Sequence, residues 1–234
     1  MPLSFEPRLD ILPESQRELW PELDAVPSDF VPYGGTALVL QLGHRISEDF
    51  DFFSSAGFDP NRLHSHLSFF RDLNPTAGEN VWVHYKRDNL EGYVQRPAGT
   101  VRIGFFGGME NLRRVEDPRR AVGSQVQVAS LIDLAGMKLR VIQMRGSWKD
   151  YVDIHALVSH GIGIPTALAA ARAIDAKFQP EISLRALQFY GDGTLARMPV
   201  GMQRDLTRWA QSVDLAKLPH FASQRGLTPG ELNR

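Results

Sequence analysis

The chain has 234 residues, of which 43% are hydrophobic and 23% are charged, and its mean hydropathy is −0.23. This is an ordinary globular composition, long enough for one large domain or two small ones. A formal net charge of −1 and a pI of about 6.7 exclude an overall basic field for nucleic acid. The absence of cysteine excludes disulfides and thiolate metal sites.

The N-terminal segment lacks the basic start and the long apolar run of a signal peptide. The most apolar early stretch, residues 37–42, is too short to span a bilayer. We therefore expect a cytoplasmic protein that makes no contact with a membrane.

The first half of the chain alternates helix and strand patterns. Residues 13–25 predict a helix in which Pro21 causes a kink or an early end. The further predicted elements, separated by glycine and proline turns, are strands at 30–33, 50–54, 81–85, 93–96 and 100–106 and helices at 36–42 and 60–73.

Beyond Pro118 the pattern becomes helical, with little strand signal from Ser130 to Arg234. We therefore predict an α+β fold, in which a mixed sheet with flanking helices is followed by a helical C-terminal half. The expected division is an α/β core over residues 1–115 and a mainly helical region over 116–234 that completes the cleft.

Gly34, Gly35 and Thr36 open the predicted helix at 36–42. A glycine turn lets backbone N–H groups approach a phosphate, and a helix N-terminus adds partial positive charge. Taken singly, these residues have ordinary explanations, because glycine is the default residue of tight turns and threonine is a common N-cap.

Asp49 and Asp51 stand at alternate positions of a predicted strand, so they share one face while Phe50 and Phe52 face the core. Two such carboxylates repel each other unless a cation bridges them, which favours a divalent metal such as Mg²⁺. The alternative is an edge strand with solvated acids, but the preceding glycine turn and helix favour a metal–triphosphate site. Arg45, at the end of that helix, is a candidate to orient either acid.

Lys138 lies in the middle of an apolar helical stripe, with Arg145 two turns further on. It either snorkels at the helix edge or meets an anion, such as a triphosphate. Asp150 and Asp153 share a face of the next predicted helix. Asp150 fits a capping box that begins at Ser147. Asp153 lies in an apolar segment and is expected to pair with one of the two cations or to help hold metal or nucleotide.

Two motif blocks thus occur in order along the chain, the first at 34–36, 43–47 and 49–53, the second at 133–138, Arg145 and 149–154. Together they resemble the AbiEii/AbiGii-type toxin nucleotidyltransferases of the polymerase-beta-like nucleotidyltransferase superfamily. The resemblance extends from about residue 14 to 215.

This resemblance implies a nucleotidyltransferase-type sheet, Mg²⁺, an NTP donor and a toxin–antitoxin or phage-defence setting with a cognate antitoxin. By position, the glycine turn and Thr36 would cradle phosphate, and Asp49 and Asp51 would hold the metal. Lys138, with Arg145 as a second candidate, would grip the triphosphate, and the pair at 150 and 153 matches the family's second acidic pair.

One departure concerns a third carboxylate that the wider superfamily places on a neighbouring strand. The candidate strand at 100–106 carries none, and Gly104 occupies the expected position. That acid would deprotonate the attacking hydroxyl, so its absence bears on turnover. Asp153, Asp150 and Glu110 are candidates to replace it, with Asp153 preferred.

The expected reaction is in-line transfer of a nucleoside monophosphate from NTP to an acceptor hydroxyl on RNA or protein. Two alternatives stay open: a nucleotide- or partner-binding protein on an inactive fold, and a kinase-like phosphotransferase. A local basic cluster is interpreted either as an RNA contact or as a solvated charged loop. It consists of Arg113, Arg114, Arg119 and Arg120.

Overall fold

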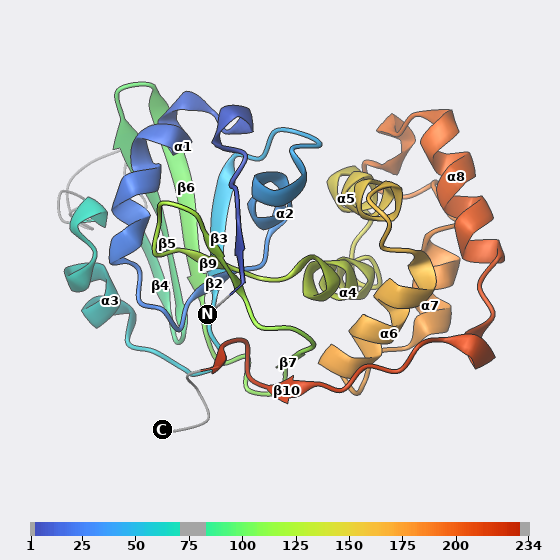
Figure 1. The fold of residues 1–234 in the computed structure, drawn as a ribbon. Helices are drawn as coiled ribbons and strands as arrows, with labels where there is room; N and C mark the ends of the chain where they lie inside the picture. The colour runs from blue at the N-terminus through green and yellow to red at the C-terminus, as the bar shows by residue number, and fades with distance from the viewer. Residues whose placement is uncertain (1–2, 71–82, 230–234) are drawn as a thin grey trace. The chain divides into compact units, whose positions relative to one another are not determined.

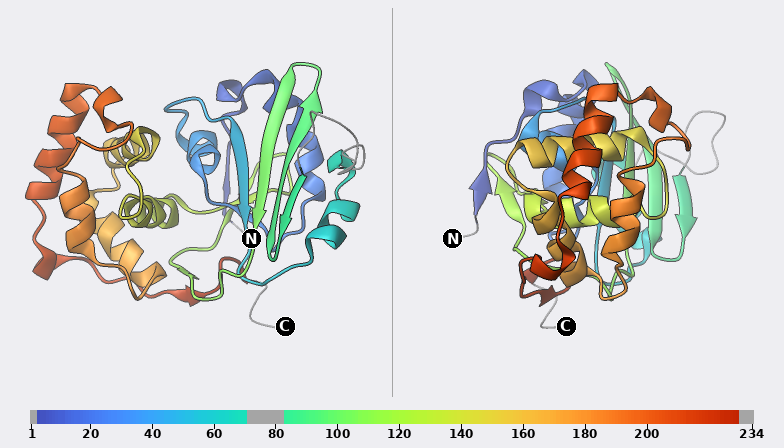
Figure 2. Two further views of the ribbon diagram at one scale, coloured as in Figure 1. Left: turned by 180° about the vertical axis from the view of Figure 1, so that it is seen from behind. Right: turned by 90° about the vertical axis from the view of Figure 1, so that its right-hand side faces the viewer.

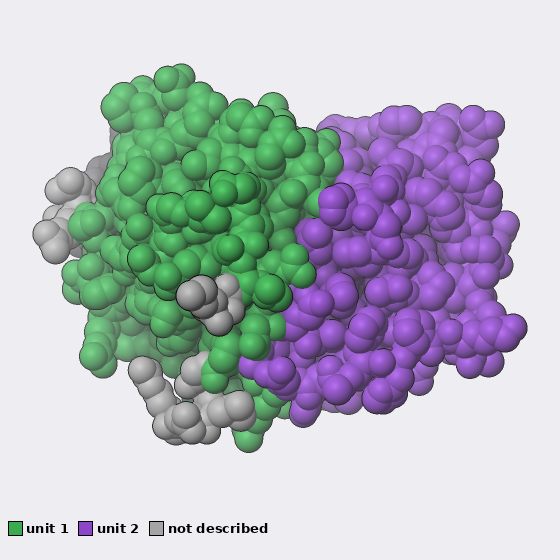
Figure 3. All heavy atoms as spheres, viewed as in Figure 1, with its two compact units in different colours: residues 1–112, 117–129, 225–234 green, residues 113–116, 130–224 purple. Residues whose placement is uncertain are grey.

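The structure is a computed structural model that describes residues 3–70 and 83–229 (Figure 1). The chain folds into two compact units, which Figure 3 shows in different colours. Unit 1 comprises Met1–Leu112, Asp117–Ala129 and Arg225–Arg234, and unit 2 comprises Arg113–Glu116 and Ser130–Gln224.

Unit 1 is built on a mixed five-stranded sheet with the strand order β2-β3-β6-β5-β4. Strands β3 and β6 are parallel, and the other neighbours are antiparallel. The strands are β2 (Val31–Pro32), β3 (Asp49–Phe53), β4 (Val83–Lys86), β5 (Asn89–Arg96) and β6 (Gly99–Phe106). A second sheet of unit 1, in the order β1-β8-β9, contains β1 (Ser4–Phe5), β8 (Arg119–Ala121) and β9 (Gln127–Val128).

The helical segments of unit 1 follow the sequence signals closely. Pro21 lies in the first turn of η2 and α1 ends just before it, which confirms the early end of the predicted helix. The segments are η1 (Leu9–Ile11), α1 (Glu14–Leu19), η2 (Trp20–Ala25), α2 (Gly35–Leu42), α3 (Pro60–His66) and η3 (Ser68–Phe70). The predicted 60–73 helix therefore breaks after His66, and its last residues, like the start of the predicted strand at 81–85, lie outside the described residues.

The core of unit 1 lies on one face of the sheet, where α1 packs against β5 and β6 (Figure 2). Strand β3 alternates as predicted: Phe50 and Phe52 are 1% exposed, whereas both aspartates remain partly exposed. Phe52 stacks on Phe105 of the parallel neighbour, with ring centroids 5.1 Å apart. The phenylalanines thus bury one face of β3 and leave the acids on the other.

Unit 2 consists mainly of helices, as predicted for this part of the chain. They are α4 (Leu131–Val141), α5 (Trp148–Ser159), α6 (Ile164–Ile174), α7 (Pro180–Ala186), η4 (Leu195–Arg197), α8 (Val200–Gln211) and η5 (Leu215–Lys217). Helices α4 and α6 cross closely at Gly136, where an added Cβ would lie 2.8 Å from the backbone nitrogen of Ala171. A glycine is therefore needed at this crossing.

The basic cluster expected at the start of the helical half lies in strands and not in a loop, and of its residues Arg113 and Arg120 are exposed. Arg113 and Arg114 form strand β7, which pairs with β10 (Gln224–Arg225). Arg114 is 1% exposed and donates to Gln224 Oε1 at 2.5 Å. The other two arginines begin β8, so the four residues are ordered in two strands of different units.

In the described part of the chain, no single helix is long and apolar enough to cross a bilayer. The one combination that passes by length and composition, α5 with α6, is bent by 116°.

Candidate active site

The glycine turn between β2 and α2, formed by Gly34 and Gly35, lies directly against the acid pair of β3, which is Asp49 and Asp51. Gly34 is the N-cap of α2, and a Cβ added there would stand 3.0 Å from Asp51 Oδ2. A Cβ added to Gly35 would collide with the guanidinium of Arg45. Because the first N–H groups of a helix have no intrahelical partner, this turn presents backbone donors beside Asp51.

Thr36 is not the N-cap of α2, a role taken by Gly34. Thr36 is 3% exposed, and its hydroxyl donates to the backbone carbonyl of Asp49 and lies 2.8 Å from Ser47 Oγ. Thr36 therefore fastens the start of α2 to the start of β3. One buried hydroxyl thus holds α2 next to Asp49, the first of the two candidate metal ligands.

Asp49 and Asp51 converge on a cation that the sequence analysis did not single out, Arg102 of β6. Its Nη1 lies 3.1 Å from Asp51 Oδ1 and 3.9 Å from Asp49 Oδ2. Arg45, the residue expected to orient the acids, donates from Nη1 to the carbonyl of Ile46 at 2.9 Å, and its role toward the acids stays a prediction. The two carboxylates thus already surround one positively charged atom.

The ionisation of Asp51 reflects this setting. Burial raises the pKa of Asp51, the Arg102 guanidinium opposes that rise, and the neighbouring Asp49 carboxylate adds to it. Burial lowers the pKa of Arg102, but the contacts with Glu91 and Asp51 outweigh it and leave that pKa raised. The acid pair is therefore better satisfied when positive charge lies next to it.

The residues of β3 fit a hard divalent cation. Such ions prefer carboxylate oxygens and fill the rest of their coordination with water and phosphate oxygens. Asp49 and Asp51 have side chains that are 47% and 26% exposed, so their oxygens are accessible from solvent. They could supply two such ligands beside the N-terminus of α2.

The site residues predicted from the second motif block lie together in unit 2. Lys138 Nζ of α4 is 2.8 Å from Asp150 Oδ1 and 2.6 Å from Asp153 Oδ2 of α5. Arg145 Nε is 2.9 Å from Asp150 Oδ2. The lysine is therefore neither snorkelling nor unpaired, because two carboxylates surround its ammonium within a buried cluster.

The capping box proposed for Asp150 is not formed. Ser147 is the N-cap of α5, but its side chain makes no capping hydrogen bond. The carboxylate of Asp150 is 2% exposed and is turned to the two cations instead. Ionic attraction within the cluster outweighs the local helix-start interaction, which is worth only about 1 kcal/mol.

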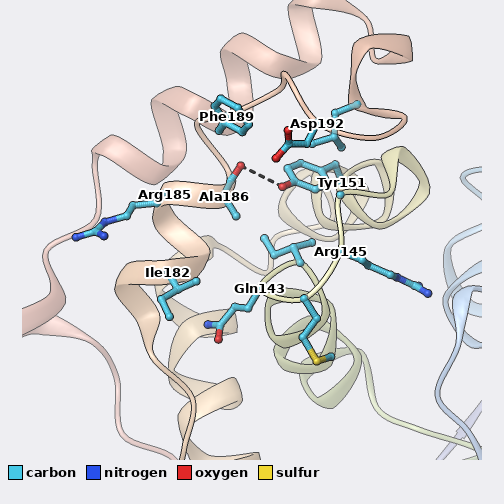
Figure 4. A pocket seen from close by; sticks show the side chains of 12 residues that line it. Gln143, Arg145, Tyr151, Ile182, Arg185, Ala186, Phe189 and Asp192 are labelled. Carbon is cyan, nitrogen blue, oxygen red and sulfur yellow. Dashed lines mark hydrogen bonds between the residues drawn. The ribbon is translucent and has the colours of Figure 1, made fainter.

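A pocket of about 430 Å³ adjoins this cluster in unit 2 (Figure 4). Its lining is mixed, with the apolar side chains of Ile182 and Phe189 and the polar side chain of Gln143. Tyr151 closes one side, and its hydroxyl donates to the carbonyl of Ala186 at 3.1 Å. The guanidinium of Arg145 points away from the pocket in this view.

Comparison with known proteins places these features in a family. The family model described as the nucleotidyl transferase AbiEii toxin of type IV toxin–antitoxin systems matches residues 23–219. The chain belongs to the AbiEii family. This membership confirms the resemblance of the motif blocks and the expected nucleotidyltransferase class, and the matched range covers both site clusters.

Two solved structures share the AbiEii fold of this chain. A Helicobacter pylori protein ascribed to the nucleotidyltransferases has a TM-score of 0.53 at 17% identity, covering 88% of this chain and 96% of that one. MenT4, a nucleotidyltransferase toxin of Mycobacterium tuberculosis, has a TM-score of 0.56 at 14% identity, covering 89% of this chain and 84% of MenT4. These likenesses confirm the predicted α+β nucleotidyltransferase-type fold.

Among curated proteins, the uncharacterized protein aq_aa25 of Aquifex aeolicus is 31% identical over 135 residues. The match spans 57% of this chain and 60% of that protein.

Sequence reasoning did not single out Arg102 and Glu91, which the structure places beside Asp49 and Asp51. Both residues lie next to Asp49 and Asp51 only because of the way in which β3, β6 and β5 pair, and this pairing cannot be read from the sequence. Glu91 was inconspicuous, since it precedes the predicted 93–96 strand, whereas β5 begins at Asn89. The longer alternation of β5 was the signal that could have placed it on a sheet face.

Proposed function

We propose that this protein is a Mg²⁺-dependent nucleotidyltransferase that moves a nucleoside monophosphate from NTP to an acceptor hydroxyl on RNA or protein. Its setting would be a toxin–antitoxin or phage-defence system with a cognate antitoxin. The observation that carries the proposal is the contact between the glycine turn and the acid pair, seen in the 3.0 Å spacing between an added Gly34 Cβ and Asp51 Oδ2. This spacing supports the proposal, because backbone N–H groups suited to a phosphate lie beside a carboxylate suited to a divalent cation.

In the proposed reaction the acceptor oxygen bonds to the α-phosphorus, and the bond from that phosphorus to the oxygen that bridges the α- and β-phosphates breaks, so that this oxygen leaves with pyrophosphate. Backbone N–H groups at Gly35 and Thr36 would orient the phosphates. Asp49 and Asp51 would hold Mg²⁺, which when bound supplies charge neutralisation at the phosphate and activation of the hydroxyl. The acceptor proton must pass to a base.

The roles of the unit 2 residues stay predictions. A nucleotide phosphate would have to compete with Asp150 and Asp153 for the ammonium of Lys138, because both carboxylates already contact it. Asp153, the preferred replacement for the missing base, is 0% exposed, so proton transfer to it requires that this ion pair open. Arg145, 64% exposed, is the most accessible cation of the cluster.

A second candidate function is NTP binding without turnover. It is favoured by Gly104, which lies directly opposite Asp51 in the parallel pairing of β3 and β6 and contributes no acid there. A kinase-like phosphotransferase would use the same metal-bound nucleotide but would release the diphosphate.

The test is a screen of the four NTPs with total tRNA and cell lysate as acceptors, followed by detection of pyrophosphate. The proposal expects pyrophosphate release that disappears in Asp51→Ala. Calorimetric binding of Mg²⁺–NTP together with no pyrophosphate release from any acceptor would instead support the second candidate.

A further inference from the structure

Glu91 lies on the same sheet face as the acid pair, although it belongs to a different strand. In the pairing of β3 with β6, Asp51 lies opposite Gly104, and in the pairing of β5 with β6, Glu91 lies opposite the same glycine. Directly paired residues of neighbouring strands project to one face of a sheet. Asp51 and Glu91 therefore flank a position that carries no side chain.

Arg102 connects Glu91 to the acid pair. It precedes Gly104 by two residues on β6, so it projects to the same face. Its Nη2 lies 2.5 Å from Glu91 Oε2, while its Nη1 faces Asp51 at 3.1 Å and Asp49 at 3.9 Å. A single guanidinium thus contacts carboxylates from two strands.

The charge of this group depends on Glu91. When ionised, the three carboxylates and one guanidinium carry a net charge of −2, which a divalent cation would neutralise. Without the glutamate the net charge is −1, and the guanidinium would face the incoming cation with its charge no longer offset. Coulomb repulsion at such short distances is strong even near a protein surface.

We propose that Glu91 is a positioning residue of the metal site, which holds Arg102 through Nη2 and offsets its charge so that Nη1 can release the aspartates when a cation binds. This inference rests on the proposed function, since it presumes a divalent cation at Asp49 and Asp51. Glu91 acts through Arg102 and not as a ligand, because its Oε2 already lies 2.5 Å from Arg102 Nη2.

The experiment measures the affinity of the whole chain for Mn²⁺ alone, from the electron paramagnetic resonance signal of the free ion. Glu91→Gln keeps the shape of the side chain and is expected to weaken Mn²⁺ binding about tenfold. Arg102→Gln is expected to tighten it. The double variant restores the net charge of −2 and is expected to bind within about threefold of the wild type.

Two controls make the result decisive. Glu22→Gln breaks a matched pair in the same unit, in which Arg96 Nη2 lies 2.5 Å from Glu22 Oε1, and is expected to leave Mn²⁺ affinity unchanged. Thermal unfolding monitored by circular dichroism identifies any variant that fails to fold. A restored affinity in the double variant cannot arise from misfolding.

Unchanged affinity in Glu91→Gln would overturn the proposal, and a double variant as weak as Glu91→Gln would overturn it in favour of a direct ligand. A wild type that binds Mn²⁺ no better than Asp51→Asn would contradict the proposed metal site itself, an outcome distinct from both.

Discussion

Lys138 of α4 and Asp153 of α5 form a buried ion pair, with Nζ and Oδ2 2.6 Å apart and side chains only 8% and 0% exposed. Asp150 shares the same ammonium at 2.8 Å. Buried charges are costly to leave unpaired, so this cluster stabilises unit 2 only while its charges remain balanced. Lys138, a residue of the second motif block, therefore contributes to the stability of unit 2 in addition to the role proposed for it in binding nucleotide.

Lys138→Met is expected to lower the free energy of unfolding by about 3 kcal/mol, because two buried carboxylates lose their shared ammonium. Urea denaturation measures this. Lys217→Met is the control, since that lysine is 82% exposed and its pair with Asp214 is worth about 0.5 kcal/mol or less. Equal stability of both variants would show that the cluster is not buried as described.

Thr36→Val should cost about 1 to 2 kcal/mol of unfolding free energy, because the Asp49 carbonyl loses a buried hydroxyl donor while the side-chain shape is kept. Thr36→Ser, which retains the hydroxyl, should lose clearly less. Urea denaturation of the two variants side by side provides the measurement. If valine and serine are equally destabilising, the hydroxyl does not fasten α2 to β3.

Gly34→Ala should weaken Mn²⁺ binding severalfold while the protein remains folded. The backbone at Gly34 has φ −86°, which alanine adopts, but the new methyl would stand 3.0 Å from Asp51 Oδ2 and must displace the carboxylate. Gly201→Ala is the matched control, because nothing lies within 4 Å of its added Cβ. An unaltered Mn²⁺ affinity in Gly34→Ala would show that the glycine turn does not adjoin the metal site.

The sequence predicted the local features of unit 1 well, because they depend on residues close along the chain. The alternation of Phe50 and Phe52 with the acids and the helix-ending Pro21 are of this kind. The partners of the acids could not be predicted, since Arg102 reaches Asp51 only through the register of a parallel pair. The sequence singled out Lys138 by its apolar stripe and offered Asp153 as a partner of Lys138 or Arg145, but the sharing of one ammonium by Asp150 and Asp153 followed only from the packing of α4 on α5.

Stability at alkaline pH should reveal the buried phenol of Tyr151. Burial raises the pKa of Tyr151 from 10.0 to about 12. Between these pH values the folded state keeps the phenol proton while the unfolded chain loses it. The contribution of Tyr151 to the free energy of unfolding is therefore complete below pH 10 and is lost as the pH rises towards about 12. Between these two pH values the free energy of unfolding of the wild type should fall by about 2 kcal/mol more than that of Tyr151→Phe, as measured by denaturation at fixed pH values. Parallel pH profiles would contradict the buried phenol.

The most direct test of nucleotidyl transfer at Asp49 and Asp51 compares NTPs labelled at the α- or the γ-phosphate. Each is incubated with the protein, total tRNA and cell lysate, and the label bound to acceptor is counted for the wild type, Asp51→Ala and the control Glu22→Gln. The account predicts that the α-label alone is transferred, that Asp51→Ala abolishes the transfer and that Glu22→Gln retains it. Transfer of the γ-label, or transfer of the α-label that persists in Asp51→Ala, would contradict it.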